Sequence, residues 1–160
     1  MKKIKVLMVC MGNICRSPMA HGYLEHLVRE AGLGERIEVD SAGTHAYHIG
    51  EPPDPRAQQT AQRRGVDLST QRARKALRED FTEFDYVLAM DRDNYTILAD
   101  LCPTGEEHRL HLFLEFAPQL SEREVPDPYY GGAAGFERVF DMVEAAAQGL
   151  LEDIRQRHTL

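Results

Sequence analysis

A short apolar run near the start of the chain constrains the fold more than any other segment. Residues Ile4–Val9 are mostly apolar and rich in β-branched side chains, which is typical of a strand buried on both faces. Ser17-Pro18 then looks like a helix start, because serine is a favoured N-cap and proline suits the first helical position. The chain therefore opens with a buried strand that leads directly into a helix.

The rest of the chain continues this alternation. Further strands are predicted at Ile37–Ser41, Phe84–Met90 and His111–Phe116, and helices at about 17–32, 54–65, 91–101 and 135–157. Strands that alternate with helices predict an α/β sandwich around a parallel sheet. A length of 160 residues fits one domain, residues 1–160, and there is no internal repeat or linker.

Composition and charge exclude several classes of protein. The formal net charge is −7, whereas a generic nucleic-acid binder usually carries a basic face, so we expect no nucleic-acid partner. No stretch approaches the roughly 18 apolar residues that a membrane helix needs. The first apolar run leads into Gly12 and Asn13 rather than into a small-residue cleavage site. We therefore expect a cytoplasmic protein that does not bind membranes.

The cysteines bear on redox state and metal binding. There are three, Cys10, Cys15 and Cys102, and an odd number without a secretion signal indicates free thiols. Cys10 and Cys15 are five residues apart, but no second pair at ligand spacing follows, and His108 and His111 are the nearest candidates. We therefore expect neither a metal site nor a cofactor.

The segment Cys10–Pro18 carries the strongest functional signal. Cys10 ends the first predicted strand, and ligands of parallel sheets bind at the carboxyl ends of strands. Gly12 and Asn13 tolerate positive φ, which lets successive N–H groups turn inward as an anion-binding nest. The next helix points its positive end at the same place. Arg16, six positions after Cys10, can meet two phosphate oxygens as a planar fork.

The same field favours a thiolate at Cys10, because cysteines beside arginine and a helix N-terminus ionise more easily than usual. Ser17 is placed to donate a hydroxyl hydrogen bond to the sulfur. Taken singly, these residues also fit a strand-end cysteine, an ordinary turn, a solvated cation and a helix cap. Together, at this spacing and on a strand-to-helix turn, they favour a phosphate-binding loop.

Val9–Pro18 resembles the signature loop of the low-molecular-weight protein-tyrosine phosphatases. The resemblance extends over nearly the whole chain, because further segments follow in the family's order: Asp40–Gly43, Pro53–Arg56, Asp80-Phe81, Phe84–Leu88 and Asp127–Tyr130. It implies a three-layer sandwich of the phosphotyrosine phosphatase I type, with a four-stranded parallel sheet flanked by helices. It also implies a metal-independent hydrolysis through a cysteinyl phosphate on Cys10. The loop would contact substrate through Met11, Gly12, Asn13, Ile14, Cys15 and Ser17.

The resemblance also places the general acid at Asp127. Pro126 and Pro128 flank it and restrict the backbone. Asp127 would protonate the departing tyrosyl oxygen and then deprotonate the water that attacks phosphocysteine. By itself, an aspartate between prolines is more often a turn residue, and Glu124 is the nearest rival acid.

Three tyrosines suggest the shape of the substrate. Tyr129 and Tyr130 would supply an aromatic wall for a phenyl ring, and the resemblance puts Tyr47 at the pocket mouth, although half-exposed tyrosines are common. Relatives that act on phosphoarginine tend to carry threonine where this chain has Ile14, which suits an aromatic ring better. The expected partners are a phosphotyrosine protein or a small aryl phosphate, with inorganic phosphate as product.

Two further features follow from the resemblance. Asn13 and Ser41 resemble residues of a network that holds the loop, with Gln71 at or near a position where the family often has histidine; glutamine hydrogen-bonds but carries no charge. Cys15 would form a reversible disulfide with Cys10 that protects against overoxidation. A small apolar filler is the alternative reading of Cys15.

Other functions remain open at this point. An arsenate reductase would also use Cys10 and Arg16, but it needs two relay cysteines close together, and the corresponding region holds only Cys102. A phosphoryl carrier would use Cys10 without an acid. A phosphoarginine phosphatase would keep the same machinery, and a non-catalytic oxyanion-binding module leaves Asp127 unexplained.

Overall fold

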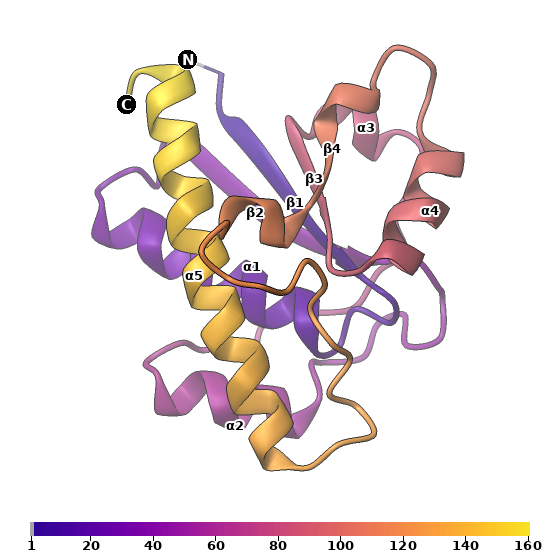
Figure 1. The fold of residues 1–160 in the computed structure, drawn as a ribbon, viewed down its shortest axis with the longest axis vertical. Helices are drawn as coiled ribbons and strands as arrows, with labels where there is room; N and C mark the ends of the chain where they lie inside the picture. The colour runs from indigo at the N-terminus through magenta and orange to yellow at the C-terminus, as the bar shows by residue number, and fades with distance from the viewer. Residues whose placement is uncertain (1) are drawn as a thin grey trace.

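Four parallel strands form the centre of the molecule (Figure 1). The computed structural model describes residues 2–160. The strands are β1 (Ile4–Cys10), β2 (Ile37–Gly43), β3 (Tyr86–Ala89) and β4 (Leu110–Leu112), in the spatial order β2-β1-β3-β4. Met8 on β1 lies opposite Ser41 on β2 and Leu88 on β3. The predicted four-stranded parallel sheet is confirmed.

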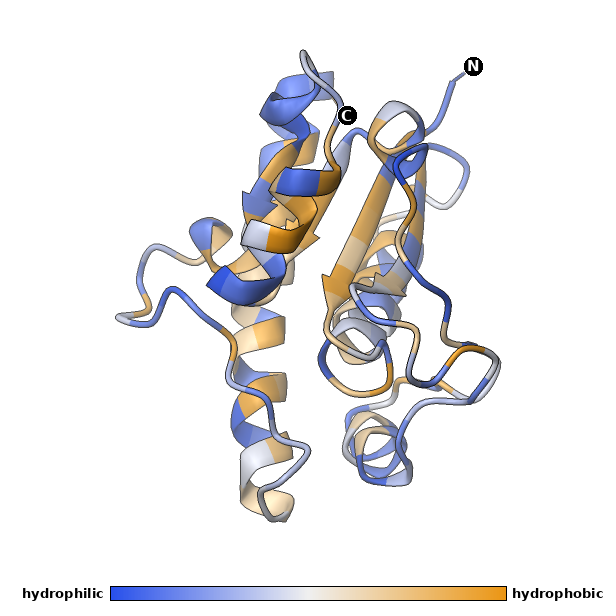
Figure 2. Cartoon of the chain, turned by 90° about the vertical axis from the view of Figure 1, so that its right-hand side faces the viewer, coloured by the Kyte–Doolittle hydropathy of each residue, from blue (hydrophilic) through white to orange (hydrophobic). Residues whose placement is uncertain are grey.

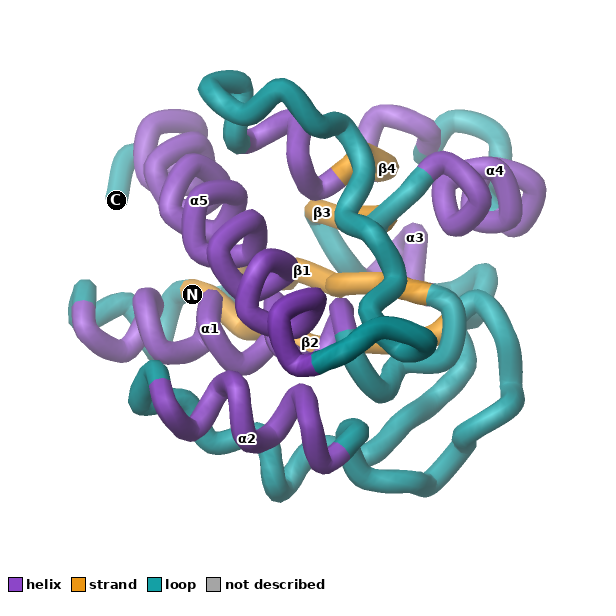
Figure 3. Tube along the Cα trace, turned by 60° about the horizontal axis from the view of Figure 1, so that its bottom comes forward, coloured by secondary structure: helices purple, strands orange, loops and turns teal. Residues whose placement is uncertain are grey.

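Helices cover both faces of the sheet and make three layers (Figure 3). They are α1 (Arg16–Glu30), α2 (Pro55–Arg63), α3 (Asp80–Glu83), α4 (Arg92–Leu101) and α5 (Ala133–His158), with 3₁₀ turns η1 (Glu107–Arg109) and η2 (Phe113–Phe116). The helices α1, α2 and α5 lie on one side, and α3 and α4 lie on the other. None of the helices in residues 2–160 has the length and apolar character to cross a membrane.

The central strand β1 is apolar on both faces, as the sequence predicts. Val6 and Met8 pack into the core beneath α1 and α5, while Leu7 and Val9 pack toward α3 and α4, and all four are fully buried. Figure 2 shows the apolar residues gathered on the strands and on the helix faces turned toward them. Each such side chain contributes roughly 1.5–3 kcal/mol when fully buried.

Two of the predicted helix starts are confirmed, the first is wrong, and α5 begins at Ala133 instead of the predicted Gly135. Asp54 caps α2 by accepting from the Arg56 amide at 2.8 Å, and Asp91 caps α4 by accepting from the Asn94 amide at 2.8 Å. Helix α1, however, begins at Arg16, and Ser17 is its second residue instead of its cap. The Ser17 hydroxyl instead faces the loop that follows β1, where it lies 3.0 Å from the Cys10 sulfur.

The fourth strand is shorter than predicted. It ends at Leu112, and residues 113–116 form η2. Phe113 and Leu114 are adjacent, yet both pack into the same core cluster, together with residues of α5, whereas a strand would turn them to opposite faces of the sheet. A Cβ at Gly149, in the middle of α5, would collide with the carbonyl oxygen of Phe116, so the glycine allows η2 to pack closely against α5.

Candidate active site

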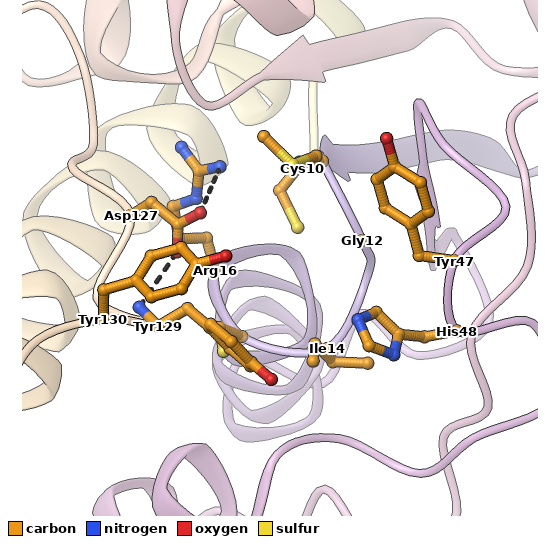
Figure 4. Close-up of a pocket in the computed structure, with 11 residues that line it drawn as sticks. Cys10, Gly12, Ile14, Arg16, Tyr47, His48, Asp127, Tyr129 and Tyr130 are labelled. Atoms are coloured by element: carbon orange, nitrogen blue, oxygen red, sulfur yellow. Dashed lines mark hydrogen bonds and ion pairs between the residues drawn. The ribbon is translucent and has the colours of Figure 1, made fainter.

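The predicted site residues meet in a pocket of about 230 Å³ at the carboxyl end of β1 (Figure 4). The residues that line it are Cys10, Met11, Gly12, Ile14, Cys15, Arg16, Tyr47, His48, Asp127, Tyr129 and Tyr130. They come from three segments: the loop after β1, the loop after β2 and the loop before α5. Asn13 and Ser17, which were also predicted to contact substrate, lie behind the lining, where they support the loop.

The loop between β1 and α1 turns at Asn13. Its φ is 59°, in the left-handed region that asparagine tolerates better than most residues. The side chain of Asn13 donates to the Ser17 hydroxyl at 2.8 Å and accepts from the Arg74 amide at 3.1 Å. Gly12 does not adopt a positive φ, contrary to our expectation. A glycine is needed there for lack of space, because a Cβ would lie 3.0 Å from the His48 ring.

A second glycine allows the loop to approach the sheet. Gly43 ends β2 opposite Cys10, and a Cβ on it would lie 2.8 Å from the Met11 carbonyl oxygen. Sequence reasoning did not give Gly43 a role. Its place beside the cysteine follows only from the register of β1 and β2.

Cys10 lies at the bottom of the pocket and is 3 % exposed. Its sulfur is 3.0 Å from the Ser17 hydroxyl oxygen. Because that oxygen already accepts a hydrogen bond from Asn13, its own proton is free to point at the sulfur. The predicted Ser17–Cys10 contact is therefore present, with the hydroxyl placed to donate to the sulfur.

Arg16 is 2 % exposed, so it is not a solvated cation. Its Nη1 donates to an Asp91 carboxylate oxygen at 2.6 Å and to the Val125 carbonyl at 3.0 Å. Burial by itself would lower the pKa of Arg16, but the nearby Cys10 and Asp91 outweigh it and raise that pKa. The guanidinium therefore stays charged inside the protein.

Asp91 is a site residue that sequence reasoning assigned only to helix capping. One of its carboxylate oxygens caps α4 and the other holds Arg16. A signal for the second role was available, because Asp91 follows β3 and the carboxyl ends of neighbouring parallel strands meet at one edge. The β1–β3 pairing that makes them neighbours was not predictable from sequence spacing.

Asp127 faces the pocket from the loop before α5. One of its oxygens lies 3.7 Å from Arg16 Nη2, and the other accepts from the Tyr129 amide at 3.0 Å. This loop passes over the carboxyl ends of the strands (Figure 3). Glu124, the rival acid, binds the amide and guanidinium of Arg92 at 2.9 and 3.1 Å and does not line the pocket.

Aromatic rings flank the opening, as predicted. Figure 4 shows Tyr47 and His48 on one side of Cys10, and Tyr129 and Tyr130 on the other. Tyr129 and Tyr130 meet edge to face with ring centroids 5.0 Å apart, but Tyr130 is 93 % exposed. Tyr130 therefore belongs to the rim, and Tyr129 to the wall. His48 was not predicted, and it is held by Glu51 at 2.7 Å.

The supporting hydrogen bonds differ from the network that we expected. The Ser41 hydroxyl lies 2.9 Å from the Nδ1 of His21 on α1, and Gln71 donates to the Pro18 carbonyl at 3.1 Å. Asn13 is bonded instead to Ser17 and Arg74. A histidine is thus present beside Ser41, but it comes from a different segment of the chain.

The structure holds all three cysteines as free thiols. Cys15 is buried, and its burial, followed by the nearby Asp54, raises its pKa far above the usual value for a thiol. Cys15 therefore stays protonated, and a thiol is a poor nucleophile. Cys10, whose sulfur contacts the Ser17 hydroxyl, is the other cysteine that lines the pocket.

Comparison with known proteins agrees with this geometry. Residues 5–159 match the model of the family described as low molecular weight phosphotyrosine protein phosphatase. A low molecular weight phosphotyrosine protein phosphatase of Schizosaccharomyces pombe is 40 % identical, over 96 % of this chain and 98 % of the relative.

Solved structures give the same answer. A protein tyrosine phosphatase of Entamoeba histolytica is 39 % identical with a TM-score of 0.93, over 99 % of this chain and 100 % of that one. A Drosophila arginine phosphatase is 31 % identical with a TM-score of 0.89, over 95 % of this chain and 98 % of that one. The likeness covers nearly the whole chain in each case, so the chain belongs to the low molecular weight phosphotyrosine protein phosphatases and is a hydrolase of that class.

Proposed function

We propose that the protein hydrolyses phosphotyrosine and small aryl phosphates in two steps, through a cysteinyl phosphate on Cys10, and releases inorganic phosphate. The observation that carries the proposal is the convergence of Cys10, Arg16 and Asp127 on one pocket with aromatic walls. Cys10 is the nucleophile, Arg16 binds the phosphate, and Asp127 is the general acid and base.

In the first step the phosphate enters the loop between Cys10 and Arg16. Because Nη1 of Arg16 is committed to Asp91 and Val125, Nε and Nη2 are left to bind two phosphate oxygens as a fork. The Cys10 thiolate attacks phosphorus, and the bond to the tyrosyl oxygen breaks. Asp127 gives its proton to that oxygen, a contribution of about 10²–10⁴-fold in rate.

In the second step water attacks the phosphocysteine. Asp127, now ionised, takes a proton from the water, and the phosphorus–sulfur bond breaks. The departing thiolate receives the hydrogen bond that Ser17 already aims at the sulfur. Arg16 stabilises the charge on the phosphoryl oxygens in both steps.

The choice of substrate follows from the depth of the pocket and from the polarity of its lining. Cys10 is nearly inaccessible at the pocket floor, which a phosphotyrosine reaches and a phosphoserine does not. Ile14 lines the same pocket as Tyr129 and favours an aromatic ring over a guanidinium. The likeness to an arginine phosphatase makes phosphoarginine the substrate against which this preference is measured.

The rival chemistries lack support. Arsenate reduction needs a relay of cysteines, yet Cys102 is the only cysteine besides Cys10 and Cys15, and it lies outside the pocket. A phosphoryl carrier or an oxyanion-binding module has no use for Asp127 beside Arg16. The cytoplasm stays the expected location, on the grounds given by the sequence.

The test is hydrolysis of p-nitrophenyl phosphate near pH 5.5 with a chelator present. Wild type should turn over, Cys10→Ser should be inactive, and Asp127→Ala should be slower by about a hundredfold. An active Cys10→Ser variant would refute the mechanism. Phosphotyrosine and phosphoarginine peptides of one sequence then measure the preference, which Ile14→Thr should shift toward phosphoarginine.

A further inference from the structure

We infer that Arg56, in the first turn of α2, is a positioning residue that couples the phosphate-binding loop to the loop that carries Asp127. The inference rests on the proposed function of Asp127 as general acid. Arg56 does not line the pocket, so it would act through the residues that it holds and not on the substrate itself. Its contacts run in two directions.

Toward the phosphate-binding loop, Arg56 is anchored through Asp54. The carboxylate of Asp54 accepts from the amide, Nε and Nη2 of Arg56 at 2.8, 3.1 and 2.9 Å. The amide of Asp54 donates to the Ile14 carbonyl at 2.8 Å. The Asp54 side chain is only 8 % exposed, so this end of the connection is fixed to the loop that surrounds Cys10.

On the other side, toward residues 126–132, which we call the acid loop, the guanidinium of Arg56 lies against two aromatic rings. Its central carbon is 5.3 Å from the Tyr129 ring centroid and 4.8 Å from that of Phe136, which is fully buried. Both distances are in the range of cation–π attraction. Nη1 also donates to the Gly131 carbonyl at 3.4 Å. Arg56 therefore lies between the acid loop and the first turn of α5.

The acid loop has few other ties to the rest of the molecule. From residue 126 to residue 132, apart from the bond of the Gly135 amide to the Gly132 carbonyl where α5 begins, the hydrogen bonds and ion pairs that reach another element in residues 2–160 are those of Arg56 with Gly131 and of Arg16 with Asp127. The second of these is a contact of the catalytic groups themselves. Among the polar contacts of this loop, that of Arg56 is thus the one that lies outside the reacting groups and the adjoining helix, while Pro128 is buried as well.

Asp127 depends on this support because its carboxylate is bonded to the Tyr129 amide. Without the guanidinium of Arg56 beside it, the Tyr129 ring shifts. The Tyr129 amide, which orients Asp127, then shifts with the ring. A misplaced acid slows proton transfer to the leaving oxygen, while attack by Cys10 is unaffected. The expected consequence is a selective loss of general-acid catalysis.

Two substrates with different leaving groups test this selectivity. Phenolate is the more basic leaving group and depends strongly on a proton, whereas p-nitrophenolate spreads its charge onto the nitro group and depends on one less. Arg56→Ala should lower kcat/KM for phenyl phosphate about tenfold, and for p-nitrophenyl phosphate by about threefold or less. Arg56→Lys, which keeps a cation beside Tyr129 but loses the fork on Asp54, should lie between wild type and alanine.

Arg63→Ala is the matched control, because Arg63 lies on the same helix and contacts Thr60 and Glu137 without touching the acid loop. It should leave the ratio of the two kcat/KM values unchanged. The rate of Cys10 alkylation by iodoacetamide should be equal in wild type and in the Arg56 variants. If Arg56→Ala does not fold, the ratio measured for Arg56→Lys decides.

A double variant separates positioning from general weakening. In an Asp127→Ala background there is no acid to position, so Arg56→Ala should cause no further selective loss with phenyl phosphate. Equal losses on both substrates, or full additivity with Asp127→Ala, would overturn the inference. If Asp127→Ala itself shows no selectivity, the proposed function fails instead, so the two failures are distinguishable.

Discussion

Asp91→Asn tests whether the carboxylate behind the pocket compensates the buried charge of Arg16. Asp91 uses one oxygen to cap α4 through the Asn94 amide and the other to hold Arg16 at 2.6 Å. Asparagine is as good a cap as aspartate, but it has one acceptor oxygen and no charge. The variant therefore leaves Arg16 without its counter-ion, and it can keep the cap only by giving up its oxygen contact with Arg16 as well.

The magnitude follows from burial. Removing one partner of a buried ion pair costs roughly 3–5 kcal/mol, and Arg16 is 2 % exposed. The Asp91 side chain is 21 % exposed, so water offsets part of the loss, and we expect Asp91→Asn to lower the free energy of unfolding by about 3 kcal/mol. Asp91→Ala, which also loses the cap, should cost about 1 kcal/mol more.

Urea unfolding followed by far-ultraviolet circular dichroism measures both losses. With an m-value of about 2 kcal/mol per molar urea, the midpoint for Asp91→Asn should fall by about 1.5 M. A loss below about 1 kcal/mol would show that Asp91 does not compensate the charge of Arg16. Arg16→Met combined with Asp91→Asn should cost less than the sum of the single variants, because neither charge is then left unpaired.

Three other perturbations have defined outcomes. Gly149→Ala should lower the melting temperature, because the new methyl group collides with the Phe116 carbonyl, although alanine is the better helix former by about 1 kcal/mol. Gly34→Ala, where the added methyl group meets open space, is the control and should be nearly neutral. A higher melting temperature for Gly149→Ala would contradict this packing. Asn13→Gly keeps access to a φ of 59° but loses the hydrogen bonds to Ser17 and Arg74. We therefore expect kcat to fall about tenfold and KM to change less. An unchanged kcat would refute the role of the Asn13 side chain. Burial, followed by nearby Asp153, raises the pKa of Tyr86 to about 12. The neutral phenol therefore adds stability that is complete below its unfolded pKa near 10 and is lost as pH rises through about 12. The unfolding free energy should decline less over that pH window in Tyr86→Phe than in wild type, and equal declines would contradict this assignment.

The fold was predictable where its signals are local. The run that forms β1 and the caps Asp54 and Asp91 are short-range patterns, and the structure confirms them. The prediction of the fourth strand was wrong beyond Leu112, because Phe113 and Leu114 both turn toward the core under α5. Only the neighbouring helix decides that these two residues face the same way.

The loop between β1 and α1 shows the same division within one site. Cys10, Arg16 and the Ser17 hydroxyl are close in sequence, and the spacing from a strand end to a helix start suffices to bring them together. Asp127 could be assigned a role only through the family resemblance, because the residues between it and Arg16 follow no pattern that reports their proximity. The structure brings the two side chains to 3.7 Å.

The sequence by itself determined the parallel α/β architecture and the strand-to-helix loop that brings Cys10, Arg16 and Ser17 together, because local propensity and spacing carry that information. The tertiary structure alone decided what supports them. Asp91 is 75 positions from Arg16, and the Arg74 amide that holds Asn13 is 61 positions away from it. Such contacts depend on which strands pair and in what register, and hydrogen-bonding side chains far apart in sequence carry no periodicity that reveals it.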